Sequence, residues 1–287
     1  MKLVTCTFRD ETHIGAIVSK SGRDYVCALN RVQPSLPDDM VQLLQAGDAA
    51  LASAQNALAI ADERDWVPQE QARLLAPVPR PGKIICVGHN YYDHAGETPP
   101  AFPDIFGKFT NVVIGPNEPI VLTRASEQVD YEGELAVVIG RRAKCTDEAH
   151  ALDVVAGYTI FNDVTARDYQ KRSSQWTLGK SFDTFGPMGP ALVTADEIGD
   201  PSNLDLTLWV NEEQRQHTTT RNLIFSIPYL ISYLSQAITL EPGDVISTGT
   251  PSGTGGSRNP PVFLKPGDRV RVCIEKIGEL ANPVAAD

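Results

Sequence analysis

The chain has 287 residues, 42% of them hydrophobic and 21% charged, which is the composition of a globular protein large enough for a sizeable core. Its formal net charge of -11 at pH 7 argues against a nucleic-acid or anionic-membrane surface as a partner. An anionic substrate stays compatible with that charge, because a metal ion and a lysine can set the local potential.

The five cysteines are widely spaced and form no C-x-x-C pair, which favours a reducing compartment without a disulfide framework. The first residues lack the apolar core of a signal peptide, and no apolar run reaches transmembrane length. We therefore expect a cytoplasmic protein without a membrane segment.

The first part of the chain reads as a small α+β domain. Short apolar runs separated by polar turns predict a β-meander up to about residue 30. A proline followed by acids begins a predicted helix at 35–47, and an alanine-rich helix follows at 48–61. Residues 74–81 contain three prolines and favour an extended connector. We place a domain boundary there, with residues 1–75 before it and residues 76–287 after it.

The second part begins with a predicted buried strand at 83–88 that runs into a polar and aromatic segment at 89–97. His94 and Glu97 in this segment are three residues apart and would share a face of a helical turn. A carboxylate beside an imidazole orients it for general-base chemistry. An ordinary surface pair on a helix is the alternative. The proline-rich stretch at 98–103 is predicted to be a loop that could cover a site.

The run from Asp130 to Gly140 contains the strongest candidate for a metal site. Its apolar second half predicts a buried strand, on which Glu132 and Glu134 would project from the same face. Two carboxylates held this close repel each other, and a hard divalent cation removes the difficulty. Asp163 ends another β-rich run and could supply a third oxygen ligand. The spacing alone equally allows an edge strand whose two glutamates face solvent.

Lys180 lies among glycine, aromatic and apolar residues, an environment that predicts a partly buried lysine with an anionic partner. Further on, residues 204–219 read as a hairpin and residues 222–235 as a core-facing helix. The Gly/Thr/Ser segment at 247–255 follows a strand and could hold an anion or form a flexible turn. Many strands with Gly/Pro turns and few helices predict a mixed, sheet-dominated α+β fold.

Several ordered motifs between about residue 82 and residue 284 resemble the fumarylacetoacetate hydrolase superfamily. The matching runs are Gly88-His89-Asn90-Tyr91 with His94, Asp130-Tyr131-Glu132-Gly133-Glu134-Leu135, Asn162-Asp163-Val164-Thr165-Ala166-Arg167-Asp168, Gly179-Lys180-Ser181-Phe182-Asp183-Thr184 and Thr248-Gly249-Thr250-Pro251-Ser252-Gly253. The resemblance implies a mixed β-roll core, a variable N-terminal domain and usually a homodimer.

The resemblance also implies site residues. Mg²⁺ or Mn²⁺ would be held by Glu132, Glu134 and Asp163, and Ca²⁺ suits the same ligands. The implied catalytic residues are the acid/base pair His94 and Glu97, with Lys180 and Gln170 at the substrate oxyanion and water. The implied substrate contacts are Tyr91, Gln170, Lys180, Gly249 and Thr250.

The substrate class implied is a small 2-oxo or 1,3-dicarbonyl acid. Our main hypothesis is metal-dependent hydrolysis of a C–C bond in a 2,4-dioxo acid, such as fumarylpyruvate, maleylpyruvate or a 2,4-diketo-3-deoxy sugar acid, with release of pyruvate. The alternative is a decarboxylase or isomerase of a 2-oxo dicarboxylic acid, of the oxaloacetate or 5-carboxymethyl-2-hydroxymuconate type. Arg124, Arg172 and Arg221 are candidates to meet a second substrate carboxylate, although surface roles are as compatible with the sequence.

Overall fold

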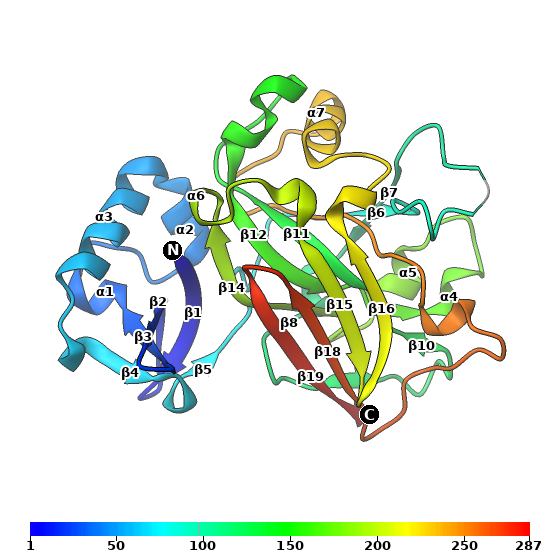
Figure 1. Ribbon diagram of the computed structural model, residues 1–287, viewed down its shortest axis with the longest axis horizontal. Helices are drawn as coiled ribbons and strands as arrows, with labels where there is room; N and C mark the ends of the chain where they lie inside the picture. The colour runs from blue at the N-terminus through cyan, green and yellow to red at the C-terminus, as the bar shows by residue number, and fades with distance from the viewer. Residues whose placement is uncertain (97) are drawn as a thin grey trace.

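The structure, a computed structural model, describes residues 1–96 and 98–287 and is dominated by β-sheet (Figure 1). This confirms the predicted mixed α+β fold. The helices are α1 (Leu29–Val32), α2 (Met40–Gln45), α3 (Gly47–Ile60), α4 (Arg167–Gln170), α5 (Thr177–Lys180), α6 (Ala195–Ile198) and α7 (Ile227–Ala237). Short 3₁₀ turns are η1 (Glu63–Asp65), η2 (Gln69–Gln71), η3 (Thr110–Val112), η4 (Glu148–Val154), η5 (Pro201–Asn203), η6 (Thr220–Asn222) and η7 (Gly255–Ser257).

The N-terminal unit is the predicted meander with two helices packed beside it, at the left of Figure 1. Asp39 caps α2 by accepting a hydrogen bond from the backbone N–H of Gln42. Gly47, with φ of 74°, lets the chain turn directly from α2 into α3. The strands of this unit are β1 (Lys2–Phe8), β2 (Glu11–Lys20), β3 (Arg23–Ala28), β4 (Trp66–Pro68) and β5 (Arg73–Leu74).

A single large sheet runs through both parts of the chain. Its order is β4-β3-β2-β1-β14-β12-β11-β17-β6-β7, with β1 paired antiparallel to β14. The division at residue 75 therefore stays a prediction. The further strands are β6 (Ile84–Gly88), β7 (Asp104–Lys108), β8 (Val113–Ile114), β9 (Ile120–Leu122), β10 (Val129–Asp130), β11 (Gly133–Ile139), β12 (Val155–Asn162), β13 (Thr165–Ala166), β14 (Gly186–Thr194), β15 (Asp205–Val210), β16 (Glu213–Thr219), β17 (Val245–Ser247), β18 (Arg269–Ile274) and β19 (Gly278–Ala286).

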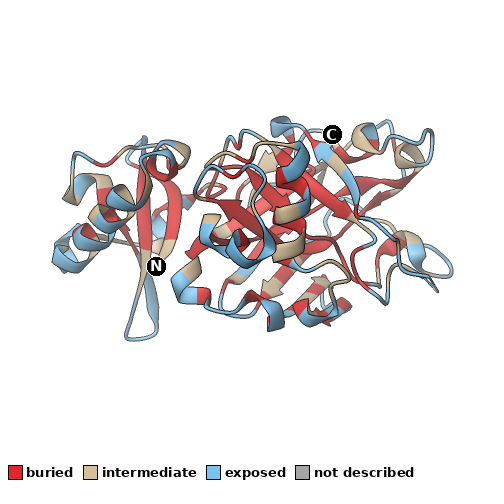
Figure 2. Ribbon diagram, turned by 90° about the horizontal axis from the view of Figure 1, so that it is seen from above, coloured by how far each residue is buried: buried red, intermediate tan, exposed pale blue. Residues whose placement is uncertain are grey.

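The second sheet, ordered β16-β15-β18-β19-β9, packs against the middle of the large one. A Cβ added at Gly133 would lie 3.1 Å from Val272 and 3.2 Å from Leu208 of this sheet. Position 133 therefore faces the core between the sheets. Because side chains alternate along a strand, Glu134 points to the opposite face. Figure 2 shows the strands of this region mostly buried, whereas the surrounding helices and loops carry most of the intermediate and exposed residues.

The helix predicted at 222–235 begins later than expected. Ser226 caps α7 by accepting from the backbone N–H of Tyr229, and Pro228 lies in the first turn, so the helix runs from Ile227. Its buried residues include Leu230, Ile231 and Leu234, as a core-facing helix requires. Within the described part of the chain, no helix is long and apolar enough to cross a membrane.

Candidate active site

Two neighbouring central strands, β11 and β12, bring three carboxylates together. Glu132 directly precedes β11, Glu134 lies on β11, and Asp163 directly follows β12. The antiparallel ladder pairs Gly133 with Asn162, and the Asp163 N–H donates to the Glu132 carbonyl at 2.9 Å. One oxygen from each carboxylate lies within 4.8 Å of the others, and all three side chains are buried. Solvent-facing glutamates, the alternative that the spacing allowed, are excluded by this burial.

Lys180 is the buried lysine that the sequence predicted. Its Nζ donates to Glu132 Oε2 at 2.8 Å and to Asp163 Oδ2 at 2.7 Å, and it is 2% exposed. Burial by itself would lower the pKa of this lysine, but the charges of Asp163 and Glu132 raise it above its usual range. Lys180 is therefore a fixed positive charge between two of the carboxylates.

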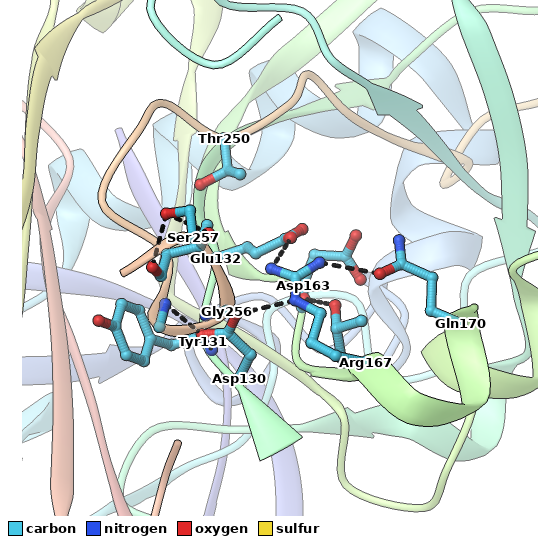
Figure 3. Close-up of polar contacts among 12 residues, drawn as sticks. Asp130, Tyr131, Glu132, Asp163, Arg167, Gln170, Thr250, Gly256 and Ser257 are labelled. Atoms are coloured by element: carbon cyan, nitrogen blue, oxygen red, sulfur yellow. Dashed lines mark hydrogen bonds and ion pairs between the residues drawn. The ribbon is translucent and has the colours of Figure 1, made fainter. Parts of the chain in front are cut away.

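Arg167 is a second cation of the site, inside a recognised motif but without a predicted role. Its guanidinium donates to Glu132, to Asp130 at 2.8 Å and to the side-chain oxygen of Gln170 at 3.0 Å (Figure 3). Burial alone would raise the pKa of Glu132, yet Arg167 and Lys180 hold it well below its usual range. Glu132 is thus held as a carboxylate.

Lys108 is a third buried cation, for which the sequence predicted no part in the site. Its Nζ donates to Asp163 Oδ1, to the Phe185 carbonyl at 2.7 Å and to the Val164 carbonyl at 3.1 Å. All three ammonium protons are used, so this lysine anchors Asp163 rather than facing a ligand. The signal that identified Lys180, a lysine among aromatic and apolar residues, is also present at Lys108 between Phe106 and Phe109.

Glu134 differs from the other two carboxylates because none of the described residues forms an ion pair with it. Its Oε2 accepts from Ser247 at 2.6 Å and from the backbone N–H of Gly249 at 2.8 Å. Burial, and then the charges of Asp163 and Glu132, raise its pKa well above the usual range. A buried carboxylate crowded by two like charges fits a divalent cation, which would compensate all three. The donor set, three carboxylates, suits Mg²⁺ or Mn²⁺.

A close approach of two short helices positions the groups beside the carboxylates. A Cβ at Gly179 would lie 2.4 Å from the backbone nitrogen of Gln170, so α5 packs on α4 only with glycine there. This contact brings Lys180 of α5 next to Arg167 of α4. The Gln170 oxygen accepts from Arg167, which leaves its amide N–H groups directed away from that guanidinium.

The Gly/Thr/Ser segment packs against the same site and is held by Asp130. The Asp130 carboxylate accepts from the backbone N–H groups of Gly255 and Gly256 at 2.7 and 2.8 Å. The Tyr131 hydroxyl donates to the Gly253 carbonyl at 3.2 Å. These bonds fix the segment, so the flexible-turn alternative is wrong. Ser257 lies on the cavity side of the loop and is labelled in Figure 3.

A cavity of about 220 Å³ opens beside the carboxylates. Its lining includes the predicted residues His94, Gln170, Lys180 and Thr250 together with the three carboxylates, and Phe106 and Trp176 among its walls. Ligand pockets for larger molecules run from about 300 to 1,000 Å³, so this cavity suits a small acid.

His94 lies on a turn after β6, where its N–H donates to the Tyr91 carbonyl at 3.0 Å. Burial lowers the pKa of the His94 imidazole, while the charge of Glu132 opposes that shift in part. The neutral form, which can accept a proton, is favoured. Glu97, its predicted partner, lies outside the described residues.

The predicted substrate contacts divide into two groups. Thr250 lines the cavity, but its hydroxyl donates to the Gly133 carbonyl at 3.1 Å and accepts from Gln216 at 2.9 Å. Tyr91 is fully buried and Gly249 donates its N–H to Glu134, and neither is among the described residues that line the cavity. Gln170, Lys180 and Thr250 therefore lie at the cavity wall, and contact of the substrate with Tyr91 and Gly249 stays a prediction.

The three arginines considered for a second carboxylate are elsewhere. Arg124 is exposed and pairs with Asp287, and Arg172 pairs with Asp168. Arg221 lines a separate cavity beside α7. None of them is among the described residues that line the cavity at the carboxylates.

Comparison with known proteins shows which family the chain resembles. The family described as fumarylacetoacetate (FAA) hydrolase, C-terminal, matches residues 83–285. A rat protein named "Oxaloacetate tautomerase Fahd2a, mitochondrial" is 46% identical over 279 residues, which cover 96% of this chain and 88% of the relative.

The similarity to solved structures extends over the whole chain. The 5-carboxymethyl-2-hydroxymuconate delta-isomerase from Mycobacterium smegmatis is 36% identical, with a TM-score of 0.80 over 100% of this chain and 99% of that one. Maleylpyruvate hydrolase from Sphingobium sp. SYK-6, in complex with manganese(II) ion and pyruvate, is 31% identical, with a TM-score of 0.82 over 100% and 99% of the two chains.

Proposed function

Because the chain belongs to the fumarylacetoacetate hydrolase family, we propose that it is a divalent-metal-dependent tautomerase of a 2-oxo dicarboxylic acid of the oxaloacetate type. The observation that carries this proposal is the 46% identity to an oxaloacetate tautomerase across 96% of the chain. The maleylpyruvate hydrolase is 31% identical, so the comparisons favour the alternative of the sequence analysis over its main hypothesis of C–C hydrolysis.

The metal would be held by Glu132, Glu134 and Asp163, as Mg²⁺ or Mn²⁺. A divalent cation bound there would act as a Lewis acid on the 2-oxo group and make the neighbouring C3–H more acidic. Lys108 contacts one oxygen of Asp163, Lys180 contacts the other, and Arg167 contacts Glu132, so these ligands are oriented before any substrate enters.

Tautomerisation moves one proton between C3 and the oxygen on C2, and it needs a group that accepts one and returns one. His94 lines the cavity and its imidazole is held in the neutral, proton-accepting form by burial. We propose that an imidazole nitrogen of His94 takes the proton from C3 and returns it to the oxygen on C2, and that it moves the proton in the opposite order when the enol is converted to the keto form. Gln170 and Lys180 would donate hydrogen bonds to the oxygen on C2, where negative charge develops when C3 loses its proton.

The same arrangement supports a second candidate, hydrolysis of an acylpyruvate such as fumarylpyruvate or maleylpyruvate. Its specific support is the neighbour solved with manganese(II) ion and pyruvate. Hydrolysis additionally needs a base for water, the role for which the sequence predicts His94 with Glu97. Tautomerisation needs His94 but no attacking water.

The test follows conversion of enol oxaloacetate to its keto form, with Mg²⁺ or Mn²⁺ and after chelation, against an enzyme-free control. Metal-dependent acceleration that is abolished in Glu134→Gln supports the tautomerase. Release of CO₂ from oxaloacetate at the same rate as loss of the enol would instead indicate a decarboxylase. No acceleration, with pyruvate released from maleylpyruvate or fumarylpyruvate, would overturn the proposal in favour of the hydrolase.

A further inference from the structure

The mouth of the cavity carries two side chains that the proposed proton transfer does not use, His89 and Lys171. Both are among its lining residues. His89 follows β6, and Lys171 follows α4, the helix that supplies Arg167 and Gln170. The buried part of the cavity lining thus carries the three carboxylates, whereas His89 and Lys171 are exposed lining residues that a second polar group of a ligand could reach.

His89 is held in one orientation from three sides. Its Nδ1 is hydrogen-bonded to Asp104 Oδ2 at 2.9 Å, its ring meets Trp176 edge-on at 5.4 Å, and the His94 ring lies 6.0 Å away. Its backbone has φ of 52°, a left-handed conformation that is strained for a residue with a side chain. Backbone strain of this kind persists where the surroundings impose it and is concentrated at functional sites.

The Asp104 contact also determines which atom of His89 remains for a ligand. Asp104 begins β7 and is paired with Gly88 in the antiparallel ladder, so the carboxylate lies beside the ring. With Nδ1 engaged, Nε2 is the nitrogen left to contact a ligand.

Lys171 contrasts with its neighbour Arg172. Arg172 pairs with Asp168 at 3.7 Å and lies 3.4 Å from the centre of the Tyr169 ring, outside the cavity. Among residues 1–96 and 98–287, no carboxylate lies within ion-pair distance of Lys171. The chain thus places one engaged and one available cation side by side.

We propose that Lys171 and His89, oriented by Asp104, bind the second carboxylate of a 2-oxo dicarboxylic acid and so select dicarboxylic over monocarboxylic substrates. This subsite rests on the proposed function, in which the 2-oxo acid end of the same molecule lies at Glu132, Glu134 and Asp163. It replaces Arg124, Arg172 and Arg221, the arginines that the sequence suggested for the role.

The expected change in affinity is moderate because the side chains of this subsite are partly exposed to solvent. Lys171 is exposed. The His89 side chain is 44% exposed and that of Asp104 is 50% exposed. A charge-assisted hydrogen bond in such a position corresponds to about a tenfold change in affinity. The affinity of a ligand that lacks the second carboxylate should not depend on these side chains.

The experiment compares two stable ligands of equal length, 2-oxoglutarate and 2-oxopentanoate, by calorimetric titration of the Mg²⁺-loaded protein. The variants are Lys171→Gln, Lys171→Arg, Asp104→Asn and the matched control Arg172→Gln. We expect Lys171→Gln to weaken 2-oxoglutarate about tenfold and 2-oxopentanoate by less than about twofold. Asp104→Asn should act in the same direction with a smaller change, Lys171→Arg should retain the preference, and Arg172→Gln should leave both affinities unchanged.

Equal losses for the two ligands in Lys171→Gln, or the same selective loss in Arg172→Gln, would overturn the subsite. So would a native protein that binds both ligands equally. The proposed function is judged separately from enol conversion by the native protein. Selective binding loss without any enol conversion would retain the subsite and reject the tautomerase, and enol conversion with parallel binding losses would do the reverse.

Discussion

The two ends of the cavity are built in different ways. At the inner end, Glu134 and Asp163 are 2% and 0% exposed and lie on or beside paired central strands. At the mouth, His89 and Lys171 are exposed and follow the ends of short elements. The sheet thus fixes the positions of the charged side chains at the inner end. Residues at the mouth can be substituted without disturbing the sheet. We infer that the strands determine the chemistry and the mouth determines which acid enters.

Replacing a buried lysine should show the largest contrast between the two ends. In Lys108→Met, Asp163 loses one of its two lysine partners, and two buried carbonyls lose a donor. Removing one partner of a buried ion pair costs about 3–5 kcal/mol, which we expect as a lower free energy of unfolding in urea titration. In Lys171→Met, at the mouth, the change should stay within about 0.5 kcal/mol. Equal effects would mean that the inner end is not held as tightly as its contacts indicate.

Glu134→Gln should abolish the metal site while the protein stays folded. Glu134 is the carboxylate without a described ion pair, so losing its charge leaves no lysine or arginine unpaired. Replacing a residue that only hydrogen-bonds to a metal ligand lowers metal affinity about 10–100-fold, so replacing a ligand itself should lower it by more than about a hundredfold. Calorimetric titration with Mn²⁺ measures this. Asp104→Asn, at the mouth, is the control and should bind Mn²⁺ normally.

How far the sequence predicted this site depends on how local each contact is. Residues i and i+2 of a strand point to the same face, so a few residues of sequence suffice to predict that Glu132 and Glu134 lie side by side. The apolar neighbours of Lys180 likewise predict its burial. Asp163 adjoins them because β11 pairs with β12, whereas the family resemblance implied only that the three carboxylates share a metal. The β-rich content predicted the fold class, whereas the pairing of β1 with β14 is not visible in any local pattern.

What the sequence missed depends on contacts between distant strands and loops. Lys108 reaches Asp163 because β7 pairs with β6 in the large sheet, and no local pattern around residue 108 identifies Asp163 as its partner. Arg172 was a reasonable candidate for a substrate carboxylate, but Asp168, one helical turn earlier, engages it. A positive charge is readable from sequence, whereas the partner that neutralises it is a property of the fold.

Ser247→Ala should give a smaller effect than loss of a ligand. Ser247 is one of two donors to Glu134 Oε2, and the backbone N–H of Gly249 remains in the variant. We expect about a tenfold weaker Mn²⁺ affinity, near the low end for such supporting residues. Ser252→Ala is the matched control, since Ser252 lies five residues further along the same Gly/Thr/Ser segment and donates to exposed Asp93. A normal affinity in Ser247→Ala would show that Gly249 alone orients the carboxylate.

The smallest expected effect concerns cysteine alkylation, which should differ least from that of an ordinary folded protein. It tests whether β6, the strand that precedes His89 at the mouth, stays closed in the native protein. Burial raises the pKa of Cys6 to about 12 and that of Cys86, on β6, well above its usual range. Because their pKa values are raised, these thiols form little thiolate at pH 8.5 and should react slowly. The stability that the protonated thiols contribute is lost only as the pH rises towards the raised pKa values. Peptide mapping after mild alkylation at pH 8.5 should find exposed Cys145 labelled and Cys6 and Cys86 protected.

Cys86 is the informative thiol because it is three residues before His89 and is paired with Ser247 on one side and Phe106 on the other. Its protection would mean that the rigid sheet reaches almost to the mouth and that only the residues after Gly88 are free to vary. Labelling of Cys86 ahead of Cys145 would show that β6 opens in the native protein. In that case the mouth and the inner end would move together, and the separation of substrate choice from chemistry would no longer follow from the structure.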